Sequence, residues 1–120
     1  MRLTLPKSRR LQHRRDFVEV RDSGRRHAQG CVVINWLPTP PDGRWQLGVI
    51  TTKALGPAHV RNRARRLIRE AFRLQQGMLT RPAKIVVIAR SSIREATLAR
   101  VQSDLLQGLR RAGLIQPVNP

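Results

Sequence analysis

Apolar residues between positions 57 and 77 recur at helical spacing. They fall at i, i+4, i+7, i+8, i+11 and i+12, as Val60, Ala64, Leu67, Ile68, Ala71 and Phe72. This spacing is typical of the buried face of an amphipathic helix. Gly56-Pro57 precedes the run and Gly77 follows it. We therefore expect a helix that begins at the proline, whose missing N–H costs nothing in a first turn, and that ends near the glycine.

Two further segments have helical patterns. Residues 14–22 carry Phe17, Val18 and Val20 and are followed by Gly24, which predicts a short helix that stops at the glycine. Near the C-terminus, Ser92-Ile93-Arg94-Glu95 has the pattern of a capping box, which predicts the start of a last helix. Apolar residues then repeat every three or four positions up to Ala112, and Gly113 closes the helix: Leu98, Val101, Leu105, Leu109 and Ala112.

Three segments are predicted to be strands. Residues 31–37 are rich in β-branched side chains, and residues 44–52 follow them across a loop of turn-forming residues, 38–43. We expect these two strands to form a hairpin. The third strand, Ile85 to Ala89, is fully apolar.

The elements follow one another as helix, strand, strand, helix, strand, helix. This order predicts an α+β fold, a small two-layer sandwich with helices on one face of a mostly antiparallel sheet. The two strands that flank the long helix are candidates for a parallel pair joined by a crossover. The length of 120 residues suits a single domain, 1–120, in which residues 1–13 form a basic arm and residues 114–120 a tail.

Charge adds a functional expectation to this pattern. The chain has 24 Lys and Arg residues against 7 acids, a net charge of +17. Self-repulsion on this scale destabilises a compact protein unless a partner neutralises it. At about 100° per residue, the side of the long helix opposite its apolar face carries Asn62, Arg65, Arg66, Arg69 and Arg73. Arg61 and Arg63 flank the apolar face.

Like charges four residues apart cost roughly 0.2–0.5 kcal/mol per pair. The arginines at 61, 65, 69 and 73 form three such pairs in succession. The alternative is a solvated basic face, but such faces normally mix the two signs of charge. We therefore predict that this helix face binds nucleic acid.

The sequence contains no recognisable set of catalytic or metal-binding residues. His13, His27 and His59 are dispersed, and Cys31, the single cysteine, lies in an apolar run and is expected to be a core residue. No nucleophile motif or phosphate-binding glycine loop is present. The longest apolar runs are too short to span a membrane, and no apolar segment typical of a signal peptide follows Met1. We expect a cytoplasmic protein.

The long helix and the residues before it resemble a known family signature. The segment from Gly48 to Phe72, with Lys53, Gly56 and Arg61-Asn62-Arg63 in register, resembles that of the bacterial ribonuclease P protein subunit. The resemblance extends to Asp16-Phe17 in the first helix and to the apolar strand ending Ile88-Ala89-Arg90. So many matched positions in fixed register are far more specific than an Arg-Asn-Arg triplet alone.

The resemblance implies a role in a ribonucleoprotein endoribonuclease. In that family the RNA subunit performs magnesium-dependent hydrolysis, with magnesium held mainly by the RNA subunit and the substrate. The protein, an auxiliary component without its own active site, binds the catalytic RNA subunit and the 5′ leader of precursor tRNA. The resemblance also implies a monomeric protein in a one-to-one complex with the RNA. It implies a left-handed βαβ crossover around the long helix, against the right-handed rule that about 98% of such connections obey.

The resemblance places RNA contacts at particular residues. On the long helix these are Arg61, Asn62, Arg63, Arg65, Arg66 and Arg69; Lys53 precedes the helix, and Phe17 corresponds to an aromatic residue that lines the leader cleft. Two positions depart from the family pattern. Some relatives carry further aromatic residues where this chain has Arg21 and Asn35, which predicts a leader site that depends more on charge and less on stacking.

Two alternatives belong to other functional classes. A ribosomal or RNA-assembly protein without a catalytic role would share the charge and could share an α+β sandwich, but has no reason to reproduce the register of Lys53, Gly56 and Arg61-Asn62-Arg63. A DNA-binding protein would need a recognition helix with base-reading polar residues and usually a dimer interface. Neither feature is apparent in the sequence.

Overall fold

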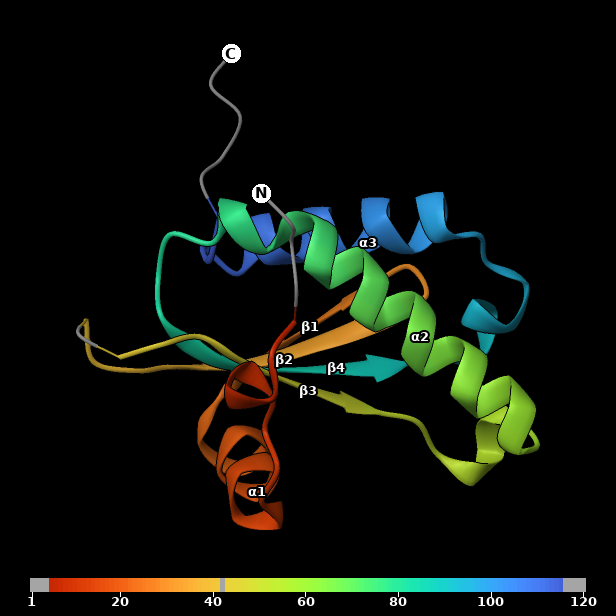
Figure 1. Cartoon of the computed structure of the whole chain (residues 1–120), viewed down its shortest axis with the longest axis horizontal. Coiled ribbons are helices and arrows are strands. Elements are labelled where there is room, and N and C mark those ends of the chain that lie inside the picture. Colours follow the sequence, from red (N-terminus) through yellow and green to blue (C-terminus); the bar gives the residue numbers. More distant parts are fainter. Residues whose placement is uncertain (1–4, 42, 116–120) are drawn as a thin grey trace.

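The fold is a four-stranded sheet with helices on both faces (Figure 1). The computed structural model describes residues 5–41 and 43–115. Within them the α-helices are α1 (Arg14–Ser23), α2 (Ala58–Gln75) and α3 (Leu98–Arg111). The strands are β1 (Arg25–Gln29), β2 (Val32–Pro38), β3 (Gln46–Ile50) and β4 (Ala83–Ala89). Short 3₁₀ turns are η1 (Lys7–Arg9), η2 (Lys53–Leu55), η3 (Gln76–Met78) and η4 (Ser91–Glu95). The α+β class and the mostly antiparallel sheet are confirmed.

The order of strands across the sheet is β1-β2-β4-β3. The predicted hairpin between residues 31–37 and 44–52 is therefore wrong, because β4 lies between β2 and β3. β4 pairs antiparallel with β2 and parallel with β3. Most of its side chains are buried, which suits a central strand covered on both faces and not an edge strand. This leaves β3 at one edge.

The hairpin that does form joins β1 to β2. β1 escaped prediction because its sequence, Arg-Arg-His-Ala-Gln, shows no apolar alternation. The connection turns at Gly30, whose φ of 55° lies in the left-handed region that glycine adopts at no steric cost. β1 forms the edge opposite β3.

The two faces of the sheet have separate cores. α2 and α3 pack on the face that carries Ile34, Ile85 and Val87, and Ile68 and Phe72 of α2 are fully buried there. α1 packs on the other face, with Val20 against Val86. The expectation of helices on one face holds for α2 and α3 only. It fails for α1 because alternate residues of β4 are apolar on both sides and both need cover.

The parallel pair of β3 and β4 is joined through α2, as the sequence suggested. The register runs from Gln46 beside Lys84 to Ile50 beside Ile88. The chain thus leaves the sheet at Ile50, enters α2 after Gly56, and returns at Ala83. The left-handed sense of this crossover stays a prediction.

Helix ends agree with the sequence at most, but not all, positions. α1 ends before Gly24, and α2 begins directly after Pro57. The capping box was misplaced: Ser92 to Glu95 form the turn η4, and α3 begins at Leu98. Its N-cap is Thr97, whose side chain accepts a hydrogen bond of 3.2 Å from the Arg100 N–H.

The predicted arm and tail both contribute to the core where they are described. Leu5 and Leu11 are buried, and the Leu11 N–H donates to the Leu47 carbonyl oxygen at 2.8 Å. Residues 5–13 therefore lie along β3 and are not a free arm, because two apolar side chains anchor them. At the other end, Leu114 and Ile115 are buried. Residues 1–4 and 116–120 lie outside the described part. Within it, no helix has the length and apolar character needed to cross a membrane.

Candidate nucleic-acid interface

Helix α2 divides into an apolar face and a polar face, as its sequence predicts. Ala64, Ile68, Ala71 and Phe72 are buried, and Leu67 packs half-buried against them. Each fully buried Ile or Phe side chain contributes roughly 1.5–3 kcal/mol relative to an exposed one. The helix is thus anchored by its apolar face. The arginines on its remaining surface differ in what they contact.

Arg63 holds the chain after β4 in place. Its guanidinium donates to three backbone carbonyl oxygens, those of Ala96 at 2.8 Å, Arg94 at 3.2 Å and Ile93 at 3.5 Å. These carbonyls belong to η4 and the residues just after it. Arg63 therefore fixes the connection to α3, a structural role that the sequence did not reveal.

Arg65 is held by two neighbours. One terminal nitrogen donates to the Thr51 hydroxyl at 2.6 Å, and the other donates to the side-chain oxygen of Asn62. Because the Asn62 oxygen is occupied, its amide N–H groups remain as donors to a ligand. Asn62 thus orients Arg65 and can itself contact a phosphate or a ribose.

Arg73 is neutralised within the chain. Its guanidinium donates to both carboxylate oxygens of Glu70, at 2.9 and 2.5 Å. The pKa of Glu70 is lowered by this hydrogen bond with Arg73. Glu70 thus orients Arg73 on the surface of α2.

The remaining arginines of the row have no acidic partner in the described part of the chain. Arg66 is exposed, and Arg61 and Arg69 are half-buried. Burial, followed by the nearby charges of Arg10 and Arg65, lowers the pKa of Arg69. Like charges so placed favour a polyanion as the missing partner.

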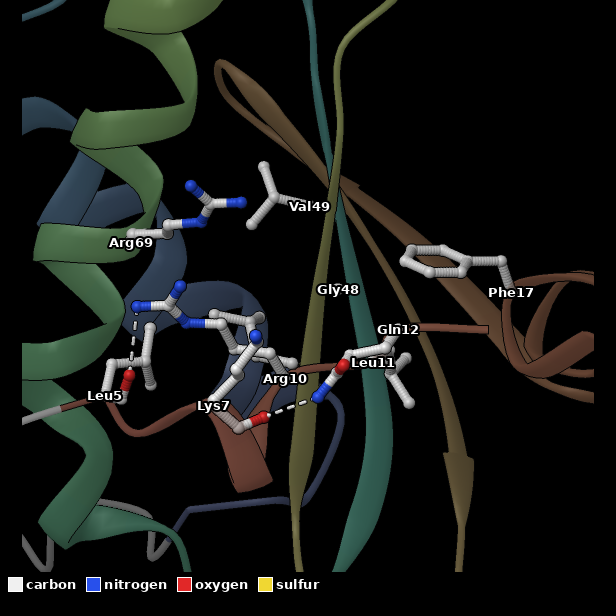
Figure 2. A pocket seen from close by; sticks show the side chains of 10 residues that line it. Leu5, Lys7, Arg10, Leu11, Gln12, Phe17, Gly48, Val49 and Arg69 are labelled. Carbon is white, nitrogen blue, oxygen red and sulfur yellow. Dashed lines mark hydrogen bonds between the residues drawn. The ribbon is translucent and has the colours of Figure 1, made fainter. Parts of the chain in front are cut away.

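Phe17 and Arg69 line one cleft beside β3. The cleft has a volume of about 280 Å³ and also includes Lys7, Arg10 and Gly48. Figure 2 shows β3 passing between Phe17, which projects from α1, and Arg69, which projects from α2. The guanidinium of Arg10 lies on the same side as that of Arg69. The cleft thus offers an aromatic ring on one side of the strand and cations on the other.

Gly48 permits this arrangement. A Cβ atom at this position would lie 2.4 Å from the ring of Phe17, so any other residue would displace the aromatic side chain. A glycine inside a strand is a sequence signal for such close approach. Gly48, Lys7 and Arg10 are site residues that sequence reasoning missed; the two cations were assigned only to a general basic arm.

Lys53 lies apart from this cleft, exposed in η2 just before α2. The structure therefore brings Phe17 and Arg69 together. It places Lys53, Arg61, Asn62 and Arg63 toward the N-terminal end of α2.

Asn35 and Arg21 do not take the place of aromatic residues in the cleft. Asn35 is buried, and its amide donates to the carbonyl oxygens of Arg25 at 2.7 Å and Val20 at 3.1 Å. It ties the end of α1 to the sheet. Arg21 is exposed and pairs with Asp22 at 3.1 Å.

Most ion pairs of the described residues lie outside helix α2. Asp16 and Glu19 pair with Lys84 at 3.0 and 3.1 Å, and not with the arginines of their own helix. The reason is that Lys84 projects from β4 toward α1. No three histidine, cysteine or acidic side chains of the described residues come together as possible metal ligands.

Cys31 is a buried core residue, as predicted. Burial, and then the neighbouring Asp104, raises the pKa of its thiol to about 11. Its backbone N–H donates to a carboxylate oxygen of Asp104 at 3.0 Å, and Arg100 donates to the same oxygen at 2.9 Å. This polar group joins α3 to the hairpin.

Residues 5–113 match the family described as Ribonuclease P. Among its relatives, the ribonuclease P protein component of Shouchella clausii is 32% identical over 114 residues, which cover 95% of this chain and 93% of the relative. That of Desulfovibrio desulfuricans is 37% identical over 113 residues, 92% of this chain and 87% of the relative.

Solved structures show the same fold. The ribonuclease P protein of Staphylococcus aureus superposes with a TM-score of 0.81 at 27% identity, covering 92% of this chain and all (100%) of that chain. That of Thermotoga maritima gives a TM-score of 0.76 at 29% identity, with 85% and 96% covered. From its sequence, its sheet topology and the basic surface of α2, the chain belongs to the family of bacterial ribonuclease P protein components.

Proposed function

We propose that this protein binds the catalytic RNA subunit of ribonuclease P and the 5′ leader of precursor tRNA. It thereby assists the endonucleolytic removal of the leader, while the RNA carries out the chemistry. The observation that carries the proposal is the cleft at the edge of β3, where Phe17 faces Arg10 and Arg69 across one strand. An extended single strand, with bases and phosphates exposed, suits such a cleft.

The two partners engage different parts of the basic surface. The N-terminal part of α2 presents exposed Asn62 and Arg66 beside half-buried Arg61 and Arg65, a set of side chains that suits the phosphates of a folded RNA. Arg63 supports this surface by fixing η4, and Lys53 extends it. The leader lies across β3, with a base against Phe17 and a phosphate near Arg69.

Magnesium is bound mainly by RNA in this proposal. The described residues provide no group of ligands that fits the ion. When bound to the RNA subunit and the substrate, magnesium supplies the activation of the attacking oxygen and the charge neutralisation that phosphodiester hydrolysis needs. The side chains of the protein position the leader and neutralise phosphates, so that less magnesium is needed for the complex to form.

Reconstitution with the RNA subunit tests the proposal. The protein without RNA should not cleave precursor tRNA at any magnesium concentration, whereas the protein with its cognate RNA should lower the magnesium concentration needed for cleavage. Cleavage rates are measured with purified components across a magnesium series. Correct 5′ maturation by protein alone would contradict the proposal, as would a holoenzyme with the same magnesium requirement as the RNA alone.

Phe17 separates stacking from charge in the leader site. Phe17→Ala should weaken binding of a precursor with a leader by about 1–3 kcal/mol, the usual contribution of one stacked base, with little change in salt dependence. A precursor without a leader should bind equally well to both proteins. Phe17→Leu is the matched variant, because it keeps an apolar side chain against Leu11, Val20 and Val86 but removes the aromatic ring, so it should lose the stacking contribution without a loss of packing. Analytical ultracentrifugation of the holoenzyme would test the predicted one-to-one stoichiometry.

A further inference from the structure

A second group of arginines surrounds Trp45 at the start of β3. Arg9, Arg44 and Arg81 line a cleft of about 240 Å³ together with Trp45 and Thr80. They come from three separate segments: η1, the loop before β3, and the loop before β4. None belongs to the surface of α2 or to the residues that line the cleft at Phe17.

Contacts among its walls give this cleft a defined shape. The guanidinium of Arg9 lies 4.7 Å from the centre of the Trp45 ring and donates to the Trp45 carbonyl oxygen at 3.3 Å. Trp45 in turn packs on Phe72, with the ring centres 5.2 Å apart. The loop that carries Arg81 is held on both sides, since Thr80 donates its N–H to the Leu114 carbonyl oxygen at 2.9 Å and Pro82 accepts from Thr39 at 3.2 Å.

The charge of this cluster is not compensated by the described chain. The ion pairs there join its acids to Arg21, Arg73, Lys84 and Arg100, so Arg9, Arg44 and Arg81 take part in none. Three guanidiniums around one cleft favour an anion with several oxygen atoms. Because Arg9 lies over the indole ring and Trp45 also packs on Phe72, the ligand should be recognised by its phosphates more than by base stacking.

Turn η1 connects this cluster with the leader cleft. Lys7 and Arg10 line the cleft at Phe17 and Arg69, whereas Arg9, between them in sequence, lines the cleft at Trp45. The segment itself is fixed to β3 by the Leu11–Leu47 hydrogen bond of 2.8 Å. Cations therefore continue from one cleft to the other past the same short turn.

We propose that Arg9, Arg44 and Arg81 bind the phosphates of leader nucleotides farther from the cleavage site than the nucleotide at Phe17, because Trp45 packs on Phe72 in the C-terminal part of α2, away from the N-terminal part proposed to bind the catalytic RNA. The inference rests on the proposed leader binding and extends it to a second site on this protein. It makes the contribution of the protein to affinity depend on leader length. The contact is with the sugar–phosphate backbone, so it should be insensitive to leader sequence.

Paired variants of the holoenzyme test this site. Arg44→Ala/Arg81→Ala removes two exposed arginines and leaves the Arg9–Trp45 contact in place. Arg25→Ala/Arg26→Ala is the matched control, with the same loss of charge from exposed positions on β1, at the opposite edge of the sheet. Binding is measured at several salt concentrations with precursor tRNAs that carry no leader, a leader of about 4 nucleotides or one of about 16, the range of site sizes known for single-strand binding domains.

The expected result is a loss specific to the long leader. The Arg44/Arg81 variant should bind the long-leader precursor roughly 3- to 10-fold more weakly, with a salt slope smaller by about 0.7 per arginine, and the other precursors should be unaffected. The control variant should change its affinity by the same factor for every precursor, and should therefore keep the dependence on leader length that the unaltered protein shows. An equal loss for the leaderless precursor would overturn the inference, because the cluster would then bind the RNA subunit; no loss would also overturn it.

The same measurements separate this inference from the proposed function. If the unaltered holoenzyme gains affinity from the short leader but the Arg44/Arg81 variant keeps the full advantage of the long one, only the second site fails. If the unaltered holoenzyme binds leaderless and leader-bearing precursors equally, leader binding itself is wrong, and the second site with it.

Discussion

Helices α2 and α3 lie side by side on the same face of the sheet, but they differ in how far their charged side chains are paired within the described chain. α3 is capped by Thr97, and its buried Asp104 binds both the Cys31 N–H and Arg100. α2 has Pro57 at its N-cap, with no side-chain hydrogen bond, and neither helix has an acid in its first turn. The polar groups named on α3 have partners within the chain, whereas Arg61, Arg66 and Arg69 of α2 have no acidic partner among the described residues.

This difference separates what stabilises the fold from what binds the partner. A positive charge near a helix N-terminus opposes the helix dipole, and successive arginines repel one another. α2 tolerates both because its apolar face is buried against the core. The electrostatic features that disfavour the isolated helix are therefore the ones that an RNA would relieve.

The largest expected effect comes from the arginines of α2. Arg66→Ala/Arg69→Ala should weaken binding to the RNA subunit and to leader-bearing precursor by about 2–4 kcal/mol in total, because hydrogen bonds to charged groups are stronger than neutral ones. The slope of log affinity against log salt should fall by about 0.7–0.9 per arginine. Thermal stability should not fall, since alanine is the better helix former and repulsion is relieved.

The matched control lies on α3. Arg110→Ala/Arg111→Ala removes the same charge, but from a helix C-terminus, where arginine interacts favourably with the dipole. This variant should lose roughly 0.3–1 kcal/mol of stability and keep most of its RNA affinity. Equal losses of affinity in the two double variants would show that net charge, and not the surface of α2, governs binding.

Substitution of Asp104 is expected to have a smaller effect, on stability and not on RNA affinity. Asp104→Ala leaves the buried Cys31 N–H without its acceptor, which should lower the free energy of unfolding by about 1–3 kcal/mol. RNA affinity at a temperature where the protein is folded should not change. Asp104→Asn keeps an oxygen acceptor and should lose less. Denaturant unfolding and RNA binding of both variants test this; a loss of affinity in the folded variants would contradict it.

Asp104 also makes the free energy of unfolding depend on pH in the acidic range. Burial alone would raise its pKa, but the hydrogen bonds from Cys31 and Arg100 lower it below the ordinary value. Because the pKa is lower in the folded state, the stabilisation is complete above the unfolded-state pKa of about 3.9 and is lost as the pH falls through the folded-state value. Asp104→Asn should lack this part of the acid dependence.

The sequence predicted the helices better than the sheet. α2 and the apolar part of α3 have strong helical periodicity, and both were found. β1 has a single apolar residue, Ala28, and its pairing with β2 depends on the turn at Gly30. The loop between β2 and β3 suggested that these two strands pair. It could not show that β4, which comes later in the chain, lies between them and leaves β3 at the edge.

The candidate site was predicted as a set of residues, but not as an arrangement. Periodicity places the arginines of α2 on one side, yet it does not show which of them the fold uses. Arg63 binds carbonyl groups about thirty residues away in sequence (separations of 30, 31 and 33). Arg10 reaches the cleft at Phe17 only because Leu5 and Leu11 fix its segment beside β3, and two isolated apolar residues give no periodic signal.

The smallest expected effect tests the unfavourable start of α2 directly. Ala58 is exposed in its first turn, and Ala58→Glu adds a negative charge where the helix dipole favours one. The free protein should gain about 0.3–1 kcal/mol of stability, while RNA affinity should fall because the carboxylate neutralises Arg61 and repels phosphate. Ala58→Gln controls for shape without charge. Ala99→Glu makes the same change in the first turn of α3 and should add a similar stability with little effect on RNA. Opposite changes in stability and affinity at Ala58, but not at Ala99, are expected from thermal unfolding and RNA titration. If Ala58→Glu binds RNA as well as Ala58→Gln does, the N-terminal end of α2 lies outside the interface.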